Sequence, residues 1–148
     1  MKELTHTDEK GKAVMVDVGD KETQVRIAKA CGHIMLEEAT LKLINDNLVR
    51  KGDVLTVAQL AGISAAKQTS ALIPLCHNIV LDNVKVVVTI DNKGVKVQSE
   101  VRCSGKTGVE MEALTAVSVA LLTVYDMCKA VDKKMIIDNI SLTEKIKR

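Results

Sequence analysis

The sequence predicts an α+β domain of the ferredoxin-like class, in which helices pack on one face of a four-stranded antiparallel sheet. The first observation is the order of patterns along the chain, which runs strand, helices, strand, strand, helix, strand. The second is a pair of alternating segments joined by a short turn, which predicts a hairpin. The third is a long segment, from Met111 to Cys128, that is apolar nearly all round. Because one sheet covers only one stripe of a helix, this segment also predicts an oligomer.

The first part of the chain is predicted to be extended. Residues 13–18 (AVMVDV) form a short alternating segment. Residues 22–36 favour a longer extended stretch with an irregularity near Gly32. We therefore expect the first strand of the sheet within this region.

Two helices follow the extended region. From Glu37 to about Asn47 the apolar residues recur on one face, and the polar segment RKGD ends this pattern. Asp53 then stands where its side chain can cap a second helix over residues 54–68. Pro74 is the only proline of the chain and ends the helical region.

The second half of the chain carries the clearest patterns. In residues 84–90 every second residue is Val or Ile and lies on one face, and in residues 95–101 three valines do the same. The connection DNKG places Gly94 where a turn would require positive φ. Residues 107–130 are predicted to form one long helix, and residues 135–142 the last strand. The hairpin and this helix fix the second half of the fold.

The start of the long helix lies in the segment SGKTGVE. Its Gly-Lys-Thr triplet is not a phosphate loop, because the first glycine of that motif would fall on Glu100. Thr107 followed three residues later by Glu110 instead predicts a capping box. The helix start beside Lys106 is a place that can receive an anion.

Length and composition narrow the class of protein. The 148 residues suit a mobile N-terminal segment over residues 1–12 and a single domain over residues 13–148. The net charge of +2 and the absence of Phe and Trp argue against a nucleic-acid binder. The polar N-terminus resembles no signal peptide, and the longest apolar run is too short to span a membrane. We therefore expect a cytoplasmic protein with four free thiols.

The segment LIPLCHN places a cysteine and a histidine side by side, at Cys76 and His77. Adjacent side chains point apart, and no further ligands stand at the spacing of a zinc finger, so a metal site is disfavoured. A nucleophile–base pair needs spatial contact, which adjacency in a bent segment does not provide. Two interpretations remain: a histidine that is ordered by the tight Pro-containing loop, and a loop whose imidazole and amides face a ligand.

A carboxylate and an ammonium group share one face of the long helix, in the segment YDMCK. Asp126 and Lys129 stand three residues apart, so they form either an exposed ion pair or an acid–base pair near a buried face. Glu112 lies 14 residues before Asp126, which separates them by about 21 Å along a helix. If both carboxylates serve one small ligand, two subunits must build the site. The dispersed cations Arg26, Lys51 and Lys67 would suit a polyphosphate if they converged.

Five segments occur in one order along the chain: MVDV, KGDVLTVAQLAGISAAKQT, LIPLCH, TGVEMEALTAVSVALLTVYDMCKAV and a closing MII strand. Together they resemble the MoaC family, the cyclic pyranopterin monophosphate synthases of molybdenum cofactor biosynthesis, from about Met15 to Lys145. The resemblance implies a lyase that acts on a cyclised GTP intermediate, (8S)-3',8-cyclo-7,8-dihydroguanosine 5'-triphosphate. The implied products are cyclic pyranopterin monophosphate and pyrophosphate.

The resemblance also implies roles for individual residues. The implied substrate-binding residues are Leu75, Cys76, His77, Met111, Glu112, Arg26 and Lys67. The implied catalytic residues are Asp126, Lys129 and Lys51. The family pattern further implies a homohexamer, a trimer of dimers with sites between subunits, that has no metal site and requires no cofactor. Whether Mg²⁺ accompanies the pyrophosphate is left open.

Two departures from the family pattern affect these expectations. Asn78 follows LCH where the family usually has proline. The chain ends in EKIKR rather than in a Gly-rich basic tail, so Lys147 and Arg148 would have to replace that tail in holding phosphates. The alternative function is an oligomeric nucleotide-binding or regulatory domain on the same fold, because fold does not fix function.

Overall fold

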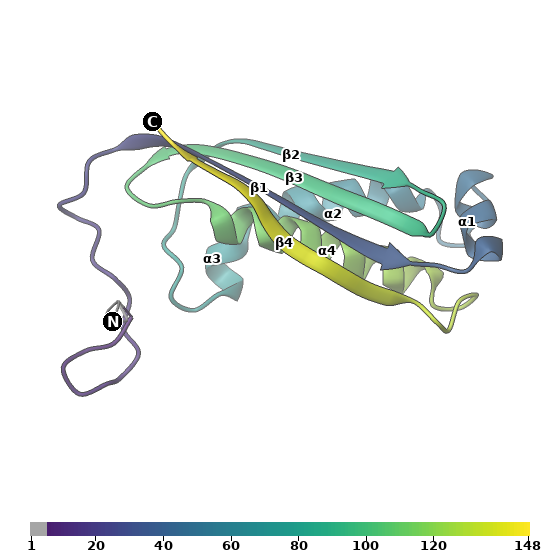
Figure 1. Cartoon of the computed structure of the whole chain (residues 1–148), viewed down its shortest axis with the longest axis horizontal. Coiled ribbons are helices and arrows are strands. Elements are labelled where there is room, and N and C mark those ends of the chain that lie inside the picture. Colours follow the sequence, from purple (N-terminus) through teal and green to yellow (C-terminus); the bar gives the residue numbers. More distant parts are fainter. Residues whose placement is uncertain (1–5) are drawn as a thin grey trace.

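The computed structural model describes residues 6–148, and its sheet has the order β2-β3-β1-β4 with every neighbouring pair antiparallel. In chain order the elements are β1 (Gln24–Met35), α1 (Glu38–Asn45), α2 (Val54–Lys67), α3 (Thr69–Leu72), β2 (Leu81–Ile90), β3 (Gly94–Gly105), α4 (Glu110–Cys128) and β4 (Ile136–Lys147). Helices α2 and α4 lie against one face of the sheet, α1 lies near one end and α3 near the other (Figure 1). The predicted ferredoxin-like class is confirmed.

Strand β1 is the centre of the sheet, and it pairs with β3 along its whole length and with β4 on its other side. The register with β4 shifts between Lys29 and Ala30 and again between Cys31 and His33, which confirms the predicted irregularity near Gly32. A Cβ atom on Gly32 would come within 2.8 Å of side-chain atoms of Leu121 and Val117. This glycine therefore lets α4 approach the sheet closely.

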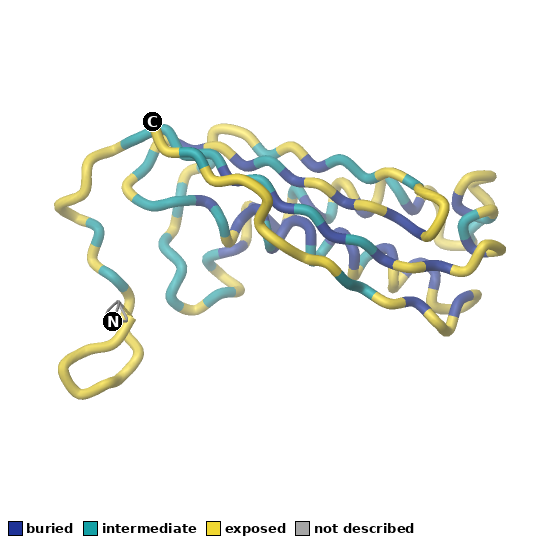
Figure 2. Tube along the Cα trace, in the orientation of Figure 1, coloured by how far each residue is buried: buried dark blue, intermediate teal, exposed yellow. Residues whose placement is uncertain are grey.

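The core is aliphatic and is built around α4. Ten of its 19 residues are buried, and they pack between the sheet and α2 (Figure 2). A Cβ atom on Gly62 of α2 would come within 2.9 Å of the Ala116 carbonyl oxygen, so α2 and α4 are also in close contact. By length and composition α4 could cross a membrane, but most of its apolar window is buried inside this domain, as in a core helix.

Two predictions for the first part of the chain differ from the structure. Residues 13–18 form no strand, because they meet no free sheet edge, and their alternation instead turns Val16 and Val18 toward the domain. Helix α1 ends at Asn45, two residues early, and Asn47 adopts a positive φ of 54° that breaks the helix. The predicted mobile segment over residues 1–12 lies partly outside the described residues. From residue 6 onward this segment forms a turn around Asp8.

The predicted capping box at the start of α4 is wrong. The helix begins at Glu110 after Val109, and the N-cap residue makes no side-chain hydrogen bond to the helix. The Glu110 carboxylate instead binds the Lys145 ammonium of β4, with 2.6 Å between Oε1 and Nζ. A partner from a distant strand thus replaces the local capping pattern.

Helix α1 is capped by a residue that lies far away in the sequence. The Asp132 carboxylate accepts hydrogen bonds from the Glu37 amide at 2.8 Å and from the Thr40 hydroxyl at 2.9 Å. Asp132 is 1% exposed. Burial opposes ionisation, but hydrogen bonds from the Glu37 and Lys134 amides and from Thr40 outweigh it and lower the pKa of Asp132. The carboxylate therefore joins the segment after α4 to the start of α1.

Replacing Asp132 with alanine should destabilise the domain by about 2 kcal/mol, because it leaves the buried Thr40 hydroxyl and the part-buried Glu37 amide without their acceptor. Urea unfolding of the purified variant measures this loss. The matched control is Asp46→Ala, which removes an exposed aspartate at the other end of α1. Equal stability of the two variants would show that Asp132 is not the cap of α1.

Candidate active site

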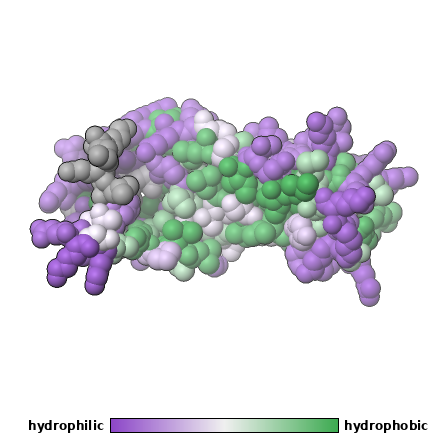
Figure 3. Space-filling view, turned by 60° about the horizontal axis from the view of Figure 1, so that its bottom comes forward, coloured by the Kyte–Doolittle hydropathy of each residue, from purple (hydrophilic) through white to green (hydrophobic). Residues whose placement is uncertain are grey.

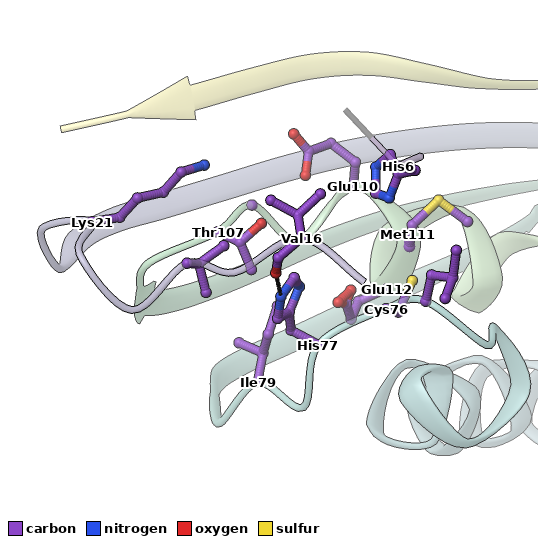
Figure 4. A pocket seen from close by; sticks show the side chains of 13 residues that line it. His6, Val16, Lys21, Cys76, His77, Ile79, Thr107, Glu110, Met111 and Glu112 are labelled. Atoms are coloured by element: carbon purple, nitrogen blue, oxygen red, sulfur yellow. Dashed lines mark hydrogen bonds between the residues drawn. The ribbon is translucent and has the colours of Figure 1, made fainter. Parts of the chain in front are cut away.

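A cavity of about 260 Å³ lies between the N-terminal segment, the loop after α3 and the first turn of α4. Its lining includes the predicted substrate-binding residues Leu75, Cys76, His77, Met111 and Glu112. The loop and the helix turn are far apart in the sequence, but their labelled side chains face one another across the cavity (Figure 4). The fold therefore brings the LCH and ME segments together.

Glu112 is the most unusual group in this cavity. The residue is 5% exposed, and its Oε2 atom has no hydrogen-bond partner within the described residues. Burial raises the pKa of Glu112 to about 7, and the nearby Glu110 carboxylate adds to the rise, against a smaller opposing effect of the helix amide. A substantial share of Glu112 is therefore a neutral carboxylic acid near neutral pH, able to donate a hydrogen bond to a ligand.

Cys76 and His77 do not form a nucleophile–base pair. Burial raises the pKa of the Cys76 thiol, and the Glu112 carboxylate raises it further, so the reactive thiolate is disfavoured. The His77 Nε2 atom lies 2.5 Å from the Val16 carbonyl oxygen. The loop interpretation therefore agrees with the geometry. Within residues 6–148 there is no group of three or more His, Cys, Asp or Glu side chains arranged to hold a metal ion.

A second cluster lies at the other end of α4. The Asp126 carboxylate is 2.9 Å from the Lys51 ammonium through Oδ2 and 2.9 Å from the Lys129 ammonium through Oδ1. All three predicted catalytic residues are therefore in contact. Their side chains are 56%, 49% and 58% exposed for Asp126, Lys51 and Lys129, so in the single chain they do not line a buried face.

The two lysines control the charge of the Asp126 cluster. Hydrogen bonds from Lys51 and Lys129, together with their positive charges, lower the pKa of Asp126 to about 2. The same contact with Asp126 raises the pKa of Lys129. At neutral pH the cluster is thus a carboxylate that holds ammonium groups, an arrangement suited to binding phosphate oxygens.

The predicted cations do not converge within one chain. Arg26 donates hydrogen bonds to the carbonyl oxygens of Gly105 and Lys106, near the Glu112 end of the molecule. Lys67 is exposed at the end of α2 that leads to the LCH loop. Lys51 lies before the start of α2, beside Asp126. Arg26 and Lys67 therefore lie at the Glu112 end of α4, and Lys51 lies at its Asp126 end.

Sequence reasoning missed the residues that the N-terminal segment brings to the cavity. These are His6, Val16, Val18 and Lys21. Val16 lies in the MVDV segment, which supported the resemblance but suggested no contact. Lys21 also lines a separate cavity of about 330 Å³ with Arg26 and Lys147. A lone lysine in a polar segment carries no sequence signal for either position.

Comparison with known protein families decides the identity of this arrangement. The model of the MoaC family matches residues 15–147, which include both clusters and the segments that position them. The chain belongs to the MoaC family.

Curated relatives of this MoaC chain agree with the family match. The chain is 56% identical over 145 residues to the cyclic pyranopterin monophosphate synthase of Chloroflexus aurantiacus, covering 97% of this chain and 89% of the relative. It is 54% identical over 143 residues to cyclic pyranopterin monophosphate synthase 1 of Mycobacterium tuberculosis, covering 96% of this chain and 84% of the relative.

A eukaryotic relative shows the MoaC sequence within a longer protein. Molybdenum cofactor biosynthesis protein 1 of Drosophila melanogaster is 58% identical over 145 residues, which are 97% of this chain but 26% of that protein. The chain therefore spans about a quarter of the Drosophila protein, but more than four fifths of the bacterial relatives.

The stability that Glu112→Gln gains over the wild type should increase as the pH rises. The native pKa is about 7 and the ordinary value is 4.5, so between these values the unfolded chain releases a proton that the native chain keeps. Wild-type stability therefore falls from pH 4.5 to pH 7 and is then level. The variant lacks this loss. Its free energy of unfolding should therefore exceed that of the wild type by up to about 3 kcal/mol at pH 8, but by little at pH 4.5.

Urea unfolding across this pH range measures the gain. Glu38→Gln serves as the reference for removing a carboxylate from an exposed position in the first turn of a helix. If the stability gain of Glu112→Gln does not change with pH, the pKa of Glu112 is not raised.

Proposed function

We propose that this chain is a cyclic pyranopterin monophosphate synthase in molybdenum cofactor biosynthesis, the activity for which its bacterial relatives are named. The observation that carries the proposal is the placement of the family segments. They form two chemically distinct clusters, a buried acid cavity and an exposed cationic cluster, at the two ends of α4. A substrate with a heterocycle at one end and a triphosphate at the other needs both kinds of surroundings.

The proposed substrate is the cyclised GTP intermediate. In the proposed reaction the imidazole-derived ring of the purine is opened and rebuilt as a pterin. A ribose oxygen forms a bond to the α-phosphorus, the bond from that phosphorus to the β-phosphate breaks, and pyrophosphate leaves. These changes make the enzyme a lyase of the phosphorus–oxygen type. The steps need proton transfers and a place for the leaving pyrophosphate.

The charges of the two clusters suggest which part of the substrate each cluster binds. The neutral Glu112 acid and His77 supply hydrogen bonds to the heterocycle. The ammonium groups of Lys51 and Lys129 bind phosphate oxygens and stabilise the charge of the leaving pyrophosphate. Asp126 is a weak base at a pKa of about 2, so its main task is to hold the two lysines in place. Arg26 and Lys67 extend the cationic surface at the Glu112 end.

The separation of the clusters supports a site shared by two subunits. Glu112 and Asp126 are 14 residues apart on one straight helix, so about 21 Å lies between them. Exposed apolar side chains, among them Leu122 and Tyr125 of α4 and Ile136 of β4, are available to bury against another copy. Figure 3 shows apolar surface along the middle of one face, with hydrophilic side chains at both ends. We propose a homohexamer, a trimer of dimers, in the cytoplasm.

We propose that the reaction needs no resident cofactor. The acid of the cavity and the ammonium groups of the cationic cluster can supply the proton transfers and the charge stabilisation. Any Mg²⁺ that takes part is a counter-ion of the released pyrophosphate.

The proposed activity is tested by mixing the purified protein with the cyclised GTP intermediate. Pyrophosphate and, after oxidation, a fluorescent pterin should form in equal amounts. Asp126→Ala should reduce turnover by roughly 10²-fold with an unchanged melting temperature, because Lys51 and Lys129 lose the carboxylate that holds them in place. The matched control is Glu144→Ala, which breaks an exposed ion pair with Lys29 and should retain activity. Binding of the intermediate without any product would contradict an enzymatic role and favour a nucleotide-binding domain.

The shared site is tested by mixing two inactive variants. Asp126→Ala and Glu112→Ala chains are combined and their subunits are allowed to exchange. If one site takes Glu112 from one chain and Asp126 from its neighbour, some mixed interfaces contain an intact site, and activity returns. Mass spectrometry of the native assembly confirms that exchange took place. Exchange without any recovery would show that each chain contains its own complete site.

A further inference from the structure

The N-terminal segment crosses the active-site region as a strap, which we define as residues 14–21. The strap contains no helix or strand, and most of its residues are exposed. Val16 and Val18 are the exceptions, and both are half-buried against the domain. Cavities lie on both sides of it, one of about 260 Å³ and one of about 450 Å³. Val18 and His77 line both cavities, so the strap and the His77 ring form the wall between them.

Within the described residues, two side-chain hydrogen bonds tie the strap to the rest of the domain. The His77 ring contacts the Val16 carbonyl oxygen through Nε2, and Figure 4 shows this carbonyl beside the ring. The Lys106 ammonium donates to the Gly19 carbonyl oxygen at 2.6 Å. The position of the strap on the domain therefore depends on the side chains of His77 and Lys106, which both belong to segments of the active-site region.

The contact with Val16 determines which ring nitrogen of His77 carries the proton. A carbonyl oxygen can only accept a hydrogen bond, so Nε2 must be the donor. In a neutral imidazole the other nitrogen, Nδ1, is then left as an acceptor. We propose that the strap is a positioning element of the active site, in which the Val16 carbonyl holds His77 as the Nε2–H tautomer and presents Nδ1 as an acceptor to the substrate.

This inference rests on the proposed function for its catalytic consequence, but not for its geometry. An acceptor at Nδ1 complements the neutral Glu112 acid, because the cavity then offers the heterocycle one donor and one acceptor. A ring released from Val16 would rotate and exchange tautomers, which removes that pairing. The expected cost of such misplacement is roughly 10-fold or more in turnover.

The first test examines geometry without any substrate. His77→Gln places an amide nitrogen about where Nε2 stands and should keep the bond to Val16, whereas the shorter side chain of His77→Asn should lose it. The Gly19 and Lys21 amides donate hydrogen bonds within the strap. Their hydrogen-exchange rates report whether the strap keeps its position on the domain. We expect near wild-type protection in His77→Gln and at least 10-fold faster exchange in His77→Asn. Equal protection in both variants would overturn the proposal.

The second test loosens the strap without changing His77. Lys106→Met removes the other tie, and Val14→Ala is the control, because Val14 is exposed on the same strap. Nitrogen NMR of the imidazole should show the Nε2–H tautomer in wild type and in Val14→Ala, and a tautomer mixture in Lys106→Met. An Nδ1–H tautomer in the wild-type protein would overturn the proposal.

Kinetics then separate this inference from the proposed function. In Lys106→Met we expect kcat to fall about 10-fold or more with a smaller change in KM, and in Val14→Ala neither constant should change. If wild type has no activity, the proposed function fails while the exchange and NMR results still decide the position of the strap. If Lys106→Met shows mixed tautomers but wild-type kcat, the strap holds His77 without serving catalysis, and the proposal is wrong.

Discussion

The length of α4 is the constraint on which the rest of this structure depends. Ten of its 19 residues lie at the centre of an aliphatic core that contains no Phe or Trp, so close backbone approach replaces large aromatic side chains. Gly32 of β1 and Gly62 of α2 both allow that approach. The same helix carries Glu112 in its first turn and Asp126 in its last. A straight helix cannot bring its two ends together, so the chemistry at each end is organised separately.

The carboxyl groups of Glu112 and Asp126 have opposite pKa shifts because their surroundings differ. Glu112 is buried without a hydrogen-bond partner for one oxygen, and its pKa rises to about 7. Asp126 is exposed between two ammonium groups, and its pKa falls to about 2. Two residues of similar intrinsic acidity thus become an acid that can donate a proton and a fixed anion that organises cations. The fold achieves this difference with the position of each residue along one helix.

Local patterns predicted most of the fold. The hairpin of β2 and β3 and the long helix α4 are confirmed, because their periodicity is strong and continuous. The positive φ predicted for Gly94 is wrong, and a glycine is needed there because the Ile34 carbonyl oxygen leaves no room for a Cβ atom. The caps were harder, because the acceptor for α1 is Asp132, which follows α4, and the partner of Glu110 is Lys145 of β4. A local rule such as the capping box cannot anticipate a partner from a distant element. Alternation over residues 13–18 likewise indicated one half-buried side but not that a sheet edge was missing.

The candidate site was predictable to a similar degree. The LCH and ME segments and the Asp126 cluster were identified from residue types and from the resemblance, and the fold places each group together. Val16 contributes a backbone carbonyl, and Lys21 is one of many lysines, so neither could be recognised in the sequence. The 21 Å separation along α4 was available from residue numbers alone, because helix rise per residue is constant.

The most direct measurement of this account is a crystal structure of the Lys129→Ala protein with the cyclised GTP intermediate bound. This variant keeps Glu112, His77 and Asp126 and should slow turnover enough to retain the substrate. The account predicts that a single bound molecule contacts Glu112 of one subunit at its heterocycle and reaches the Asp126 cluster of a neighbouring subunit with its phosphates. A substrate whose contacts all come from one chain, at either end of α4, would contradict it.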